Sequence, residues 1–221
     1  MAHQLKDQPR VYTENSSFVG PAYSDEEIEA VLKRRKIRYK KVENKAKAAA
    51  ELLAAGNIVS FFNGRMEFGD RALGCRSILG DPRDASMKDK INAVIKYREA
   101  YRPFAPSILG DRVREYFNVE EGFTCDYMEK VVPFREEKKK DVPAVVHFDG
   151  SGRVQTVSKS TNPDYYELIS EFEKITGIPI VLNTSFNING EPVVLTPDDA
   201  INTLFNSGLE HLFLSNFYVS K

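Results

Sequence analysis

At two places in this chain a predicted helix ends at a glycine and a short apolar run follows. This repeated pattern constrains the fold more than any other feature. The helical segments 43–55 and 163–176 end at Gly56 and Gly177, and a short apolar run follows each glycine. Glycine is typical of a helix C-terminus because it adopts the left-handed conformation without steric cost. Short apolar runs bounded by turn residues are typical of buried strands. The pattern predicts helices that alternate with the strands of a mixed sheet, in an α/β or α+β fold.

Other local signals predict where the remaining elements lie. Residues 24–27 and 196–199 are capping patterns that start helices, and Asp84 is placed to cap a helix that ends near Lys96. The charged run 135–143 is expected to be a solvated surface loop. Four residues of helix 163–176 should face the core: Leu168, Ile169, Phe172 and Ile175. Extended segments are expected at 58–62, 106–109, 127–132, 153–157, 178–182, 211–214 and 217–219.

Length and composition indicate one globular domain. The chain has 221 residues, of which 42% are hydrophobic, enough for a single sizeable core. Residues 1–23 are polar and show no clear periodicity, so we expect an extended lead-in or linker there. Residues 24–221 are expected to form the single domain.

Charge and cysteine content exclude several classes of protein. A net charge of −1 argues against a general nucleic-acid coat, which carries a strong basic excess. No apolar run approaches the roughly 18 residues of a membrane helix, and the N-terminal residues lack the apolar core of a signal peptide. Two cysteines without metal-ligand spacing make no disulfide framework, so a reduced, cytoplasmic location is expected.

The segment 64–77 is unusual because three glycines and three arginines directly follow a predicted strand. Such a turn could direct its backbone N–H groups and the guanidinium groups of Arg65, Arg71 and Arg76 at one anion. The segment matches neither common glycine-rich phosphate motif. The alternative is an arginine-rich surface turn with local ion pairs.

Two short motifs far apart in the chain suggest an anion site. Lys96 and Arg98 close a predicted helix, and Ser185 and Asn187 follow a predicted strand. Fixed cations and small neutral polar groups suit a polyphosphate and an acyl or carbamoyl phosphate. Neighbouring proline and aromatic residues should hold Arg98 in a stiff, partly apolar setting. The alternative for the Ser185 segment is a turn with side-chain to backbone hydrogen bonds.

Several other polar residues are weaker candidates. His147 and Asp149 could form a metal pair or a general base, although a structural hydrogen bond is the commoner role for such a pair. Glu67 and Glu191 could bind Mg²⁺ through nucleotide phosphates, but we assign no metal ligand. Cys75 has cationic neighbours that could lower its pKa, yet nothing in the sequence pairs it with a base, which favours an inert thiol.

Four motifs together resemble the C-terminal part of the carbamoyltransferase family typified by NodU, CmcH and TobZ. In order along the chain they read GRMEFGDRALGCRSILGDPRD, KYREAYRPFAPS, HFDGSGRVQTV and LNTSFNINGEPVV. The resemblance runs from about Gly20 to near the C-terminus, and it implies a YrdC-like fold. The K-x-R and S-x-N signature of such proteins is matched at 96–98 and 185–187. Asp70 stands where proline is usual and Cys75 where asparagine is usual.

The resemblance implies a fold and a reaction. The fold is an α/β, YrdC-like twisted mixed β-sheet flanked by helices, with a positively charged cavity. The reaction joins carbamoyl phosphate to ATP, a substrate accompanied by Mg²⁺, and forms carbamoyladenylate. A separate N-terminal domain or subunit would then transfer the carbamoyl group to an acceptor hydroxyl; the sequence leaves open whether this chain is a natural subunit or a part of a longer protein.

The predicted site follows from the motifs and the resemblance together. Lys96 and Arg98 are the predicted catalytic residues. Residues predicted to bind the nucleotide or carbamoyl phosphate are Arg65, Arg71, Arg76, Arg102, Arg153, Asn183, Ser185 and Asn187. Two alternatives stay open. One is an enzyme that makes threonylcarbamoyladenylate from threonine, bicarbonate and ATP; the other is a non-catalytic module that binds RNA or a partner, which the near-neutral charge disfavours.

Overall fold

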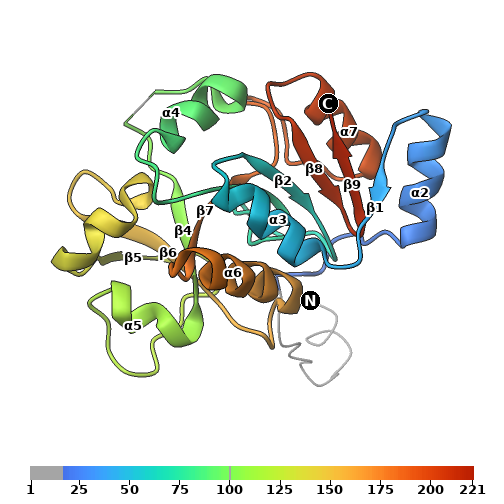
Figure 1. Ribbon diagram of the computed structural model, residues 1–221. Coiled ribbons are helices and arrows are strands. Elements are labelled where there is room, and N and C mark those ends of the chain that lie inside the picture. Colours follow the sequence, from blue (N-terminus) through green and yellow to red (C-terminus); the bar gives the residue numbers. More distant parts are fainter. Residues whose placement is uncertain (1–16, 100) are drawn as a thin grey trace, which may run out of the picture.

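A computed structural model describes residues 17–99 and 101–221, which fold around one mixed β-sheet (Figure 1). Its nine strands lie in the order β1-β9-β8-β2-β3-β7-β4-β6-β5. The pairs β2–β8 and β4–β6 are parallel, and the other neighbours are antiparallel. The strands are β1 (Lys40–Lys41), β2 (Val59–Phe62), β3 (Arg76–Gly80), β4 (Ala105–Leu109), β5 (Lys130–Pro133), β6 (Ser151–Val157), β7 (Ile180–Ser185), β8 (His211–Leu214) and β9 (Phe217–Ser220).

Helices cover both faces of this sheet. α3 (Lys45–Ala54) and α6 (Pro163–Thr176) lie side by side on one face (Figure 1). Successive residues of a strand point to opposite faces, and Phe61 packs with α3 and α6 whereas Phe62 packs in the second core. The prediction of a mixed sheet flanked by helices is confirmed. The other helices are α2 (Asp25–Arg34), α4 (Met87–Ile91), α5 (Val113–Tyr116) and α7 (Pro197–Phe205).

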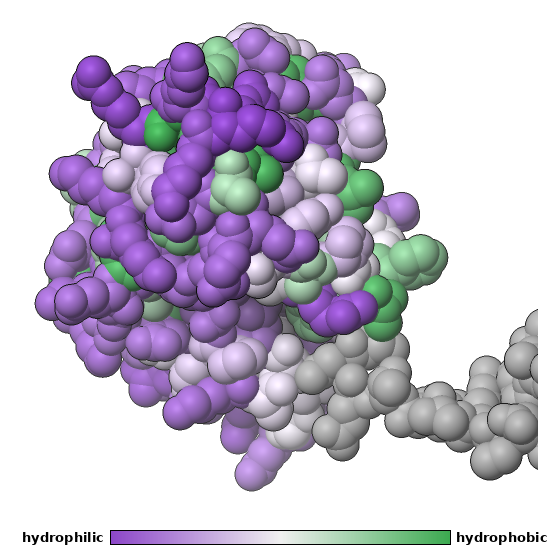
Figure 2. Space-filling view, turned by 90° about the vertical axis from the view of Figure 1, so that its right-hand side faces the viewer, coloured by the Kyte–Doolittle hydropathy of each residue, from purple (hydrophilic) through white to green (hydrophobic). Residues whose placement is uncertain are grey.

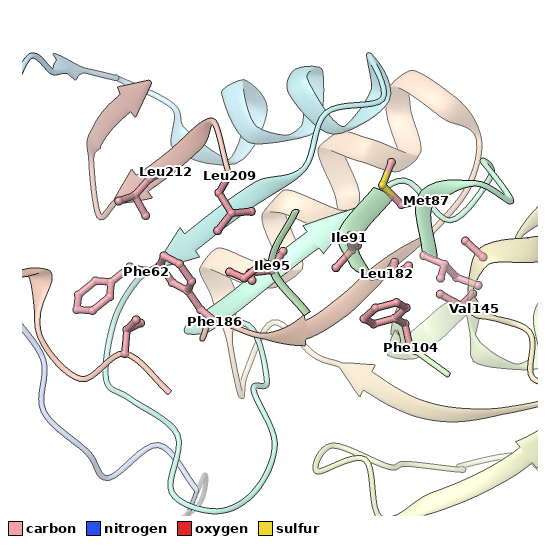
Figure 3. Packing of buried hydrophobic residues seen from close by; sticks show 14 of the residues in the cluster. Phe62, Met87, Ile91, Ile95, Phe104, Val145, Leu182, Phe186, Leu209 and Leu212 are labelled. Carbon is pink, nitrogen blue, oxygen red and sulfur yellow. The ribbon is translucent and has the colours of Figure 1, made fainter. Parts of the chain in front are cut away.

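The second core is built mainly under α4 and α7. α4 continues as a π-helical turn, Asn92–Lys96. Figure 3 shows Met87, Ile91 and Ile95 directed from this helix toward side chains of the sheet and of the segment after β7, including Phe62 and Phe186. All five of these side chains are at most 2% exposed. Burial of each such side chain contributes about 1.5–3 kcal/mol to folding, so the end of the helix, where Lys96 lies, is held firmly against the sheet.

Most predicted helix signals are confirmed in atomic detail. Ser24 and Thr196 form capping boxes at α2 and α7, and Asn162 and Gly177 cap the two ends of α6. Two predictions are wrong. Asp84 does not cap the next helix, because Ser86 is the N-cap residue of α4 and Asp84 Oδ1 accepts from Ser86 N and Oγ instead. Ile175 is 49% exposed because it lies in the last turn of α6, beyond Phe172, the final residue of the buried face.

The charged run lies on the surface as predicted, but part of it is helical rather than a loop. Residues Glu136–Asp141 form a 3₁₀-helix. Val142, which follows it, is fully buried in the second core. The stem of Lys139 also lies against Gly150 of the turn before β6, so close that a Cβ there would meet its Cε at 2.9 Å. Apolar anchoring at one end thus orders a segment whose composition is polar.

The predicted lead-in is tied to the domain at its C-terminal part; residues 1–16 lie outside the described residues. Gly20 and Pro21 pair with Met66 through backbone hydrogen bonds: Gly20 N donates to Met66 O at 2.9 Å, and Met66 N donates to Pro21 O at 3.0 Å. Phe68 N also donates to Ser17 O. Residues 17–21 therefore run along the loop after β2 as an added extended segment.

Surface character agrees with a folded globular domain. Figure 2 shows one face of the molecule, which is largely hydrophilic with scattered hydrophobic residues. Within the described residues, no helix has the length and apolar character needed to cross a membrane.

Candidate anion-binding site

A cavity of about 150 Å³ lies where β7 meets β4, and arginines dominate its polar wall. The guanidinium-bearing residues are Arg71, Arg98, Arg102 and Arg153. The remaining lining residues are Asp70, Ala72, Pro103, Phe104, Ala105, Met128, Asn183, Thr184 and Ser185. The structure thus brings together six of the ten residues that the sequence predicted for the site.

Sheet register explains why such distant residues meet. In the antiparallel ladder Ala105 of β4 pairs with Asn183 of β7. Ser107 pairs with Gln155 of the parallel strand β6, which places Arg153 two residues earlier at the same end of the sheet. Ser185 closes β7 opposite Ser77. Three strand ends therefore supply one wall, and the loops 63–75 and 97–104 and the segment before β5 supply the other residues.

The four arginines of the cavity form no ion pair with a carboxylate among the described residues. In the part of the chain that the structure describes, none of them lies within 4.0 Å of a carboxylate oxygen, whereas arginines elsewhere form such pairs. Burial and the charges of Arg102 and Arg153 lower the pKa of Arg98, and burial and Arg71 lower that of Arg153. Mutual repulsion of this kind favours binding of an anion.

Two of these guanidinium groups also hold unused donors. The Nε atoms of Arg98 and Arg153 are buried and have no hydrogen-bond partner among the described residues. Arg98 lies over the ring of Phe104, 4.4 Å from its centre, and donates to Pro103 O at 3.4 Å. A buried N–H without a partner costs about 1–3 kcal/mol, which a bound oxyanion would offset.

Lys96 lies behind this cavity and is surrounded by oxygen atoms. Its Nζ is 2.7 and 3.3 Å from Ser185 O and Oγ, and 3.1 and 2.8 Å from Asn187 O and Oδ1. Lys96 is only 4% exposed. Burial and two neighbouring guanidinium groups lower the pKa of Lys96 to about 7, although the four oxygens favour the charged form. The ammonium group therefore joins the two halves of the K-x-R and S-x-N pattern directly.

The S-x-N residues differ in what they face. Ser185 is part of the cavity wall, and its Oγ donates to Asn187 Oδ1 at 2.6 Å. Asn187 turns away from the cavity, and its Nδ2 donates to the carbonyl oxygens of Ile188 and Glu191. Asn187 thus closes the turn after β7 and holds Lys96. For Asn187 the structure matches the alternative from the sequence, a turn with side-chain to backbone hydrogen bonds, whereas Ser185 lies in the cavity wall.

Asn183 forms the floor of the cavity. It is 1% exposed, and its Nδ2 lies 3.0–3.2 Å from Ala72 O, Ser107 Oγ and Gln155 Oε1. Because all three neighbours accept hydrogen bonds, the amide orientation is fixed, since Ser107 gives its own proton to Gln155. The loop residue Ala72 is thereby held against β7.

The loop after β2 already contains its own anion. Glu67 is 6% exposed, and its Oε1 accepts from the backbone N–H groups of Leu73, Cys75 and Arg76 at 2.8, 2.5 and 3.3 Å. The expectation that these N–H groups face an external anion is therefore wrong, because an internal carboxylate occupies them. Burial raises the pKa of Glu67, and the backbone N–H groups of Cys75 and Leu73 and the charge of Arg76 oppose that rise.

Two predicted arginines lie outside the cavity. The guanidinium group of Arg76 is fully buried 3.6 Å from the centre of the Phe62 ring, and it donates to the carbonyl oxygens of residues 21, 63, 64 and 75. Arg65 donates to Phe18 O and Val19 O at 3.2 and 2.9 Å. In this structure both residues fasten segments of the chain to one another.

The remaining candidates have structural contacts. His147 Nδ1 and Asp149 Oδ1 both contact Ser151 Oγ, at 3.3 and 2.6 Å. Burial raises the pKa of Cys75 well above its usual value, which makes the thiol inert as expected. No group of three or more His, Cys, Asp or Glu residues suited to a metal ion occurs among the described residues.

Sequence reasoning missed several wall residues. Met128 is the clearest case: it lies in a segment predicted to be extended, but it has φ of 58° and packs with Leu73 and Ala105. A positive φ at a methionine leaves no trace in the sequence. Thr184 and Pro103 lie inside motifs that the sequence did single out, so proximity to those motifs was the available signal.

The fold and the cavity define an α/β domain with an arginine-lined cavity at one end of its sheet. The sequence profile described as "Carbamoyltransferase C-terminus" matches residues 50–221, and the chain therefore belongs to this family. It is 46% identical to nodulation protein NolNO of Sinorhizobium fredii, over 84% of this chain and 27% of that protein. It is 49% identical to nodulation protein NolO of Bradyrhizobium diazoefficiens, over 80% of this chain and 32% of that protein. The chain thus spans about a third or less of these relatives.

A solved structure supports the fold. The chain is similar to full-length HypF, crystallised in a phosphate- and nucleotide-bound form, with a TM-score of 0.53. The identity is 18%, over 78% of this chain and 21% of that chain. At this identity the likeness concerns the fold alone, and it confirms the predicted YrdC-like architecture.

Proposed function

We propose that this domain forms carbamoyladenylate from carbamoyl phosphate and ATP. The observation that carries the proposal is the cavity with four arginines that form no ion pair with a described carboxylate. Both substrates are phosphate anions, and guanidinium groups bind phosphate oxygens through paired hydrogen bonds. The family to which the chain belongs, and the name of that family, support a role in carbamoyl transfer.

The proposed chemistry needs positioning and charge rather than a protein nucleophile. Water converts carbamoyl phosphate into carbamate and inorganic phosphate. A carbamate oxygen then attacks the α-phosphorus of ATP, the bond from that phosphorus to the β-phosphate oxygen breaks, and pyrophosphate leaves. Arg98 and Arg153, with their unused Nε donors, would stabilise the charge that develops on the phosphoryl oxygens.

Lys96 and Ser185 have complementary roles in this proposal. Ser185 offers its backbone and hydroxyl to the cavity wall, and the Lys96 ammonium fixes both it and Asn187. Lys96 is thereby a positioning group, and a polyphosphate that reached it would have to replace one of its four oxygen contacts. Arg71 and Arg102 add positive charge at the cavity wall, where carbamoyl phosphate would bind.

Two further components would complete the reaction. Mg²⁺ would accompany the phosphates of ATP, and Asp70 supplies a carboxylate at the cavity wall, which suits an ion that keeps most of its ligands as water and phosphate oxygen. An N-terminal domain or a separate subunit would transfer the carbamoyl group to an acceptor hydroxyl. The greater length of the relatives supports this partner.

The test uses the isolated chain with ATP, Mg²⁺ and carbamoyl phosphate, and it measures release of pyrophosphate. We expect turnover that depends on carbamoyl phosphate and falls at least 100-fold in Arg98→Ala and Lys96→Ala, as for the loss of a preorganised charged group. Arg114→Ala is the matched control, because this arginine is exposed on α5. Undiminished turnover in both site variants contradicts the assignments. Turnover with threonine and bicarbonate in place of carbamoyl phosphate would favour the threonylcarbamoyladenylate alternative.

A further inference from the structure

Gln155 is a buried polar residue that lies next to the arginine-lined cavity without belonging to its wall. It is 2% exposed, and it follows Arg153 by two residues in β6, so both side chains lie on the same face of the sheet. A buried amide is costly unless its donors and acceptors find partners. The partners of this amide therefore indicate its role.

The oxygen of the Gln155 amide joins three neighbouring strands. Oε1 accepts from Ser107 Oγ of β4 at 2.7 Å and from Asn183 Nδ2 of β7 at 3.2 Å. Ser107 and Asn183 are both at most 1% exposed. These bonds fix the orientation of the amide, because its oxygen must face the two donors and its NH₂ group must then face the other way.

The NH₂ group of Gln155 faces the loop that carries Arg71. Its Nε2 donates to Leu73 O at 3.0 Å, and Asn183 Nδ2 donates to Ala72 O at 3.0 Å. Two successive carbonyl groups directly after Arg71 are thus bound to the sheet. Ala72 and Leu73 are at most 5% exposed, whereas Arg71 is exposed. The two bonds locate the backbone from which the Arg71 side chain reaches the cavity wall.

Glu67 and Gln155 act on this loop in different ways. Glu67 belongs to the loop, and its carboxylate binds three later backbone N–H groups, which fixes the shape of the loop but not its place on the sheet. Gln155 belongs to β6, so its bond fixes the loop relative to the strand end that carries Arg153. Asn162 Nδ2, at the start of α6, also donates to Leu73 O, at 3.3 Å. This second donor keeps the carbonyl group satisfied when Gln155 is replaced.

We propose that Gln155 is a positioning residue, which holds the loop 70–73 on the sheet so that the guanidinium group of Arg71 lies in the cavity wall with the other three arginines. Gln155 itself touches no ligand. The four guanidinium groups repel one another, so a loop released from the sheet lets Arg71 move away and lowers the positive charge that an anion meets. This inference rests on the proposed binding of phosphate anions in the cavity.

The test measures binding of inorganic pyrophosphate, which requires no reaction, by titration calorimetry of the full chain. Gln155→Leu removes the amide and keeps a side chain of similar size. It should weaken pyrophosphate binding roughly 5- to 50-fold, up to the equivalent of one charge-assisted hydrogen bond. Arg71→Ala should weaken binding at least as much. Adding Gln155→Leu to Arg71→Ala should cause no further loss, because Gln155 acts through Arg71.

Kinetics and a matched control separate positioning from general destabilisation. In the pyrophosphate-release assay, Gln155→Leu should raise the KM for carbamoyl phosphate by a similar factor and change kcat by less than about threefold, as for the loss of uniform binding. Ile201→Val is the control, because this fully buried residue of α7 belongs to neither the loop nor the cavity wall. It should lower the urea midpoint and leave pyrophosphate affinity unchanged. Gln155→Met, with a side chain that adapts to its surroundings, makes the same test if Gln155→Leu does not fold.

Three results overturn the inference: unchanged pyrophosphate affinity in a folded Gln155 variant, unchanged affinity in Arg71→Ala, or a full additional loss when the two changes are combined. Absence of pyrophosphate release, combined with pyrophosphate binding that follows the expected pattern in all variants, would instead overturn the proposed reaction and leave the positioning role of Gln155 standing.

Discussion

Replacing Glu67 tests whether the glycine-rich loop is organised by an internal carboxylate. In Glu67→Ala, three buried backbone N–H groups at residues 73, 75 and 76 lose their acceptor. Each unsatisfied N–H costs about 1–3 kcal/mol, and partial entry of water should limit the total to about 3–6 kcal/mol. Glu67→Gln keeps an oxygen in place and loses only the assistance of the charge, so we expect a loss of about 1–2 kcal/mol.

Urea unfolding followed by far-UV circular dichroism measures both losses as shifts of the midpoint at unchanged slope. Domains of this size usually have a stability of about 5–15 kcal/mol, so Glu67→Gln should stay folded in buffer. A loss below about 1 kcal/mol in Glu67→Ala would refute the account of the loop. Equal losses in the two variants would also refute it, because the acceptor oxygen would then be irrelevant. If Glu67 instead bound Mg²⁺, activity would fall while stability stayed constant.

Two more expectations concern the site and its support. Because burial and neighbouring guanidinium groups lower the pKa of Lys96 to about 7, its ammonium form is lost as the pH rises through about 7. The kcat/KM for pyrophosphate release should therefore fall above pH 7 in the wild type but not in Lys96→Arg; a flat wild-type profile from pH 6 to 8.5 would contradict this. Gly74→Ala should cost about 2–5 kcal/mol in urea unfolding, because φ is +108° and the new Cβ would lie 2.2 Å from the Tyr165 ring. Gly190→Ala, with positive φ but no neighbour within 4 Å, should cost about 1–2 kcal/mol; similar losses in the two variants would refute the steric argument.

Local signals in the sequence predicted the elements well. Capping residues such as Ser24, Asn162 and Thr196 determine helix starts through contacts within three residues, so no tertiary information is needed to recognise them. The helix that delivers Lys96 was also predictable from the spacing of its apolar residues. Its end was not: the π-helical turn and the left-handed Tyr97, at φ 42° and ψ 43°, depend on packing against other parts of the chain.

The sequence predicted the residue types of the candidate site but not the position and contacts of each residue. Arginine and glycine content marked the loop 64–77 as unusual, yet nothing in the sequence shows that Glu67 occupies its N–H groups. Arg76 and Arg71 look equivalent in the sequence. Their positions differ because Arg76 begins β3 and is buried over Phe62, whereas Arg71 lies on the loop beside the cavity. Such distinctions arise from strand pairing, which sequence spacing does not encode.

The left-handed conformation of Tyr97 directs the two cations of the K-x-R motif to different places. Lys96 ends the π-turn and points into the turn after β7, where it holds Ser185 and Asn187. The chain then reverses through a conformation that costs a non-glycine residue about 1–2 kcal/mol, and Arg98 comes to lie in the cavity wall beyond it. Backbone strain persists where surrounding contacts over-determine it, and here the four oxygens around Lys96 and the ring of Phe104 under Arg98 supply those contacts. The two cations, only two residues apart, thus serve one site from opposite sides: one orders the wall, and the other offers its charge to the ligand.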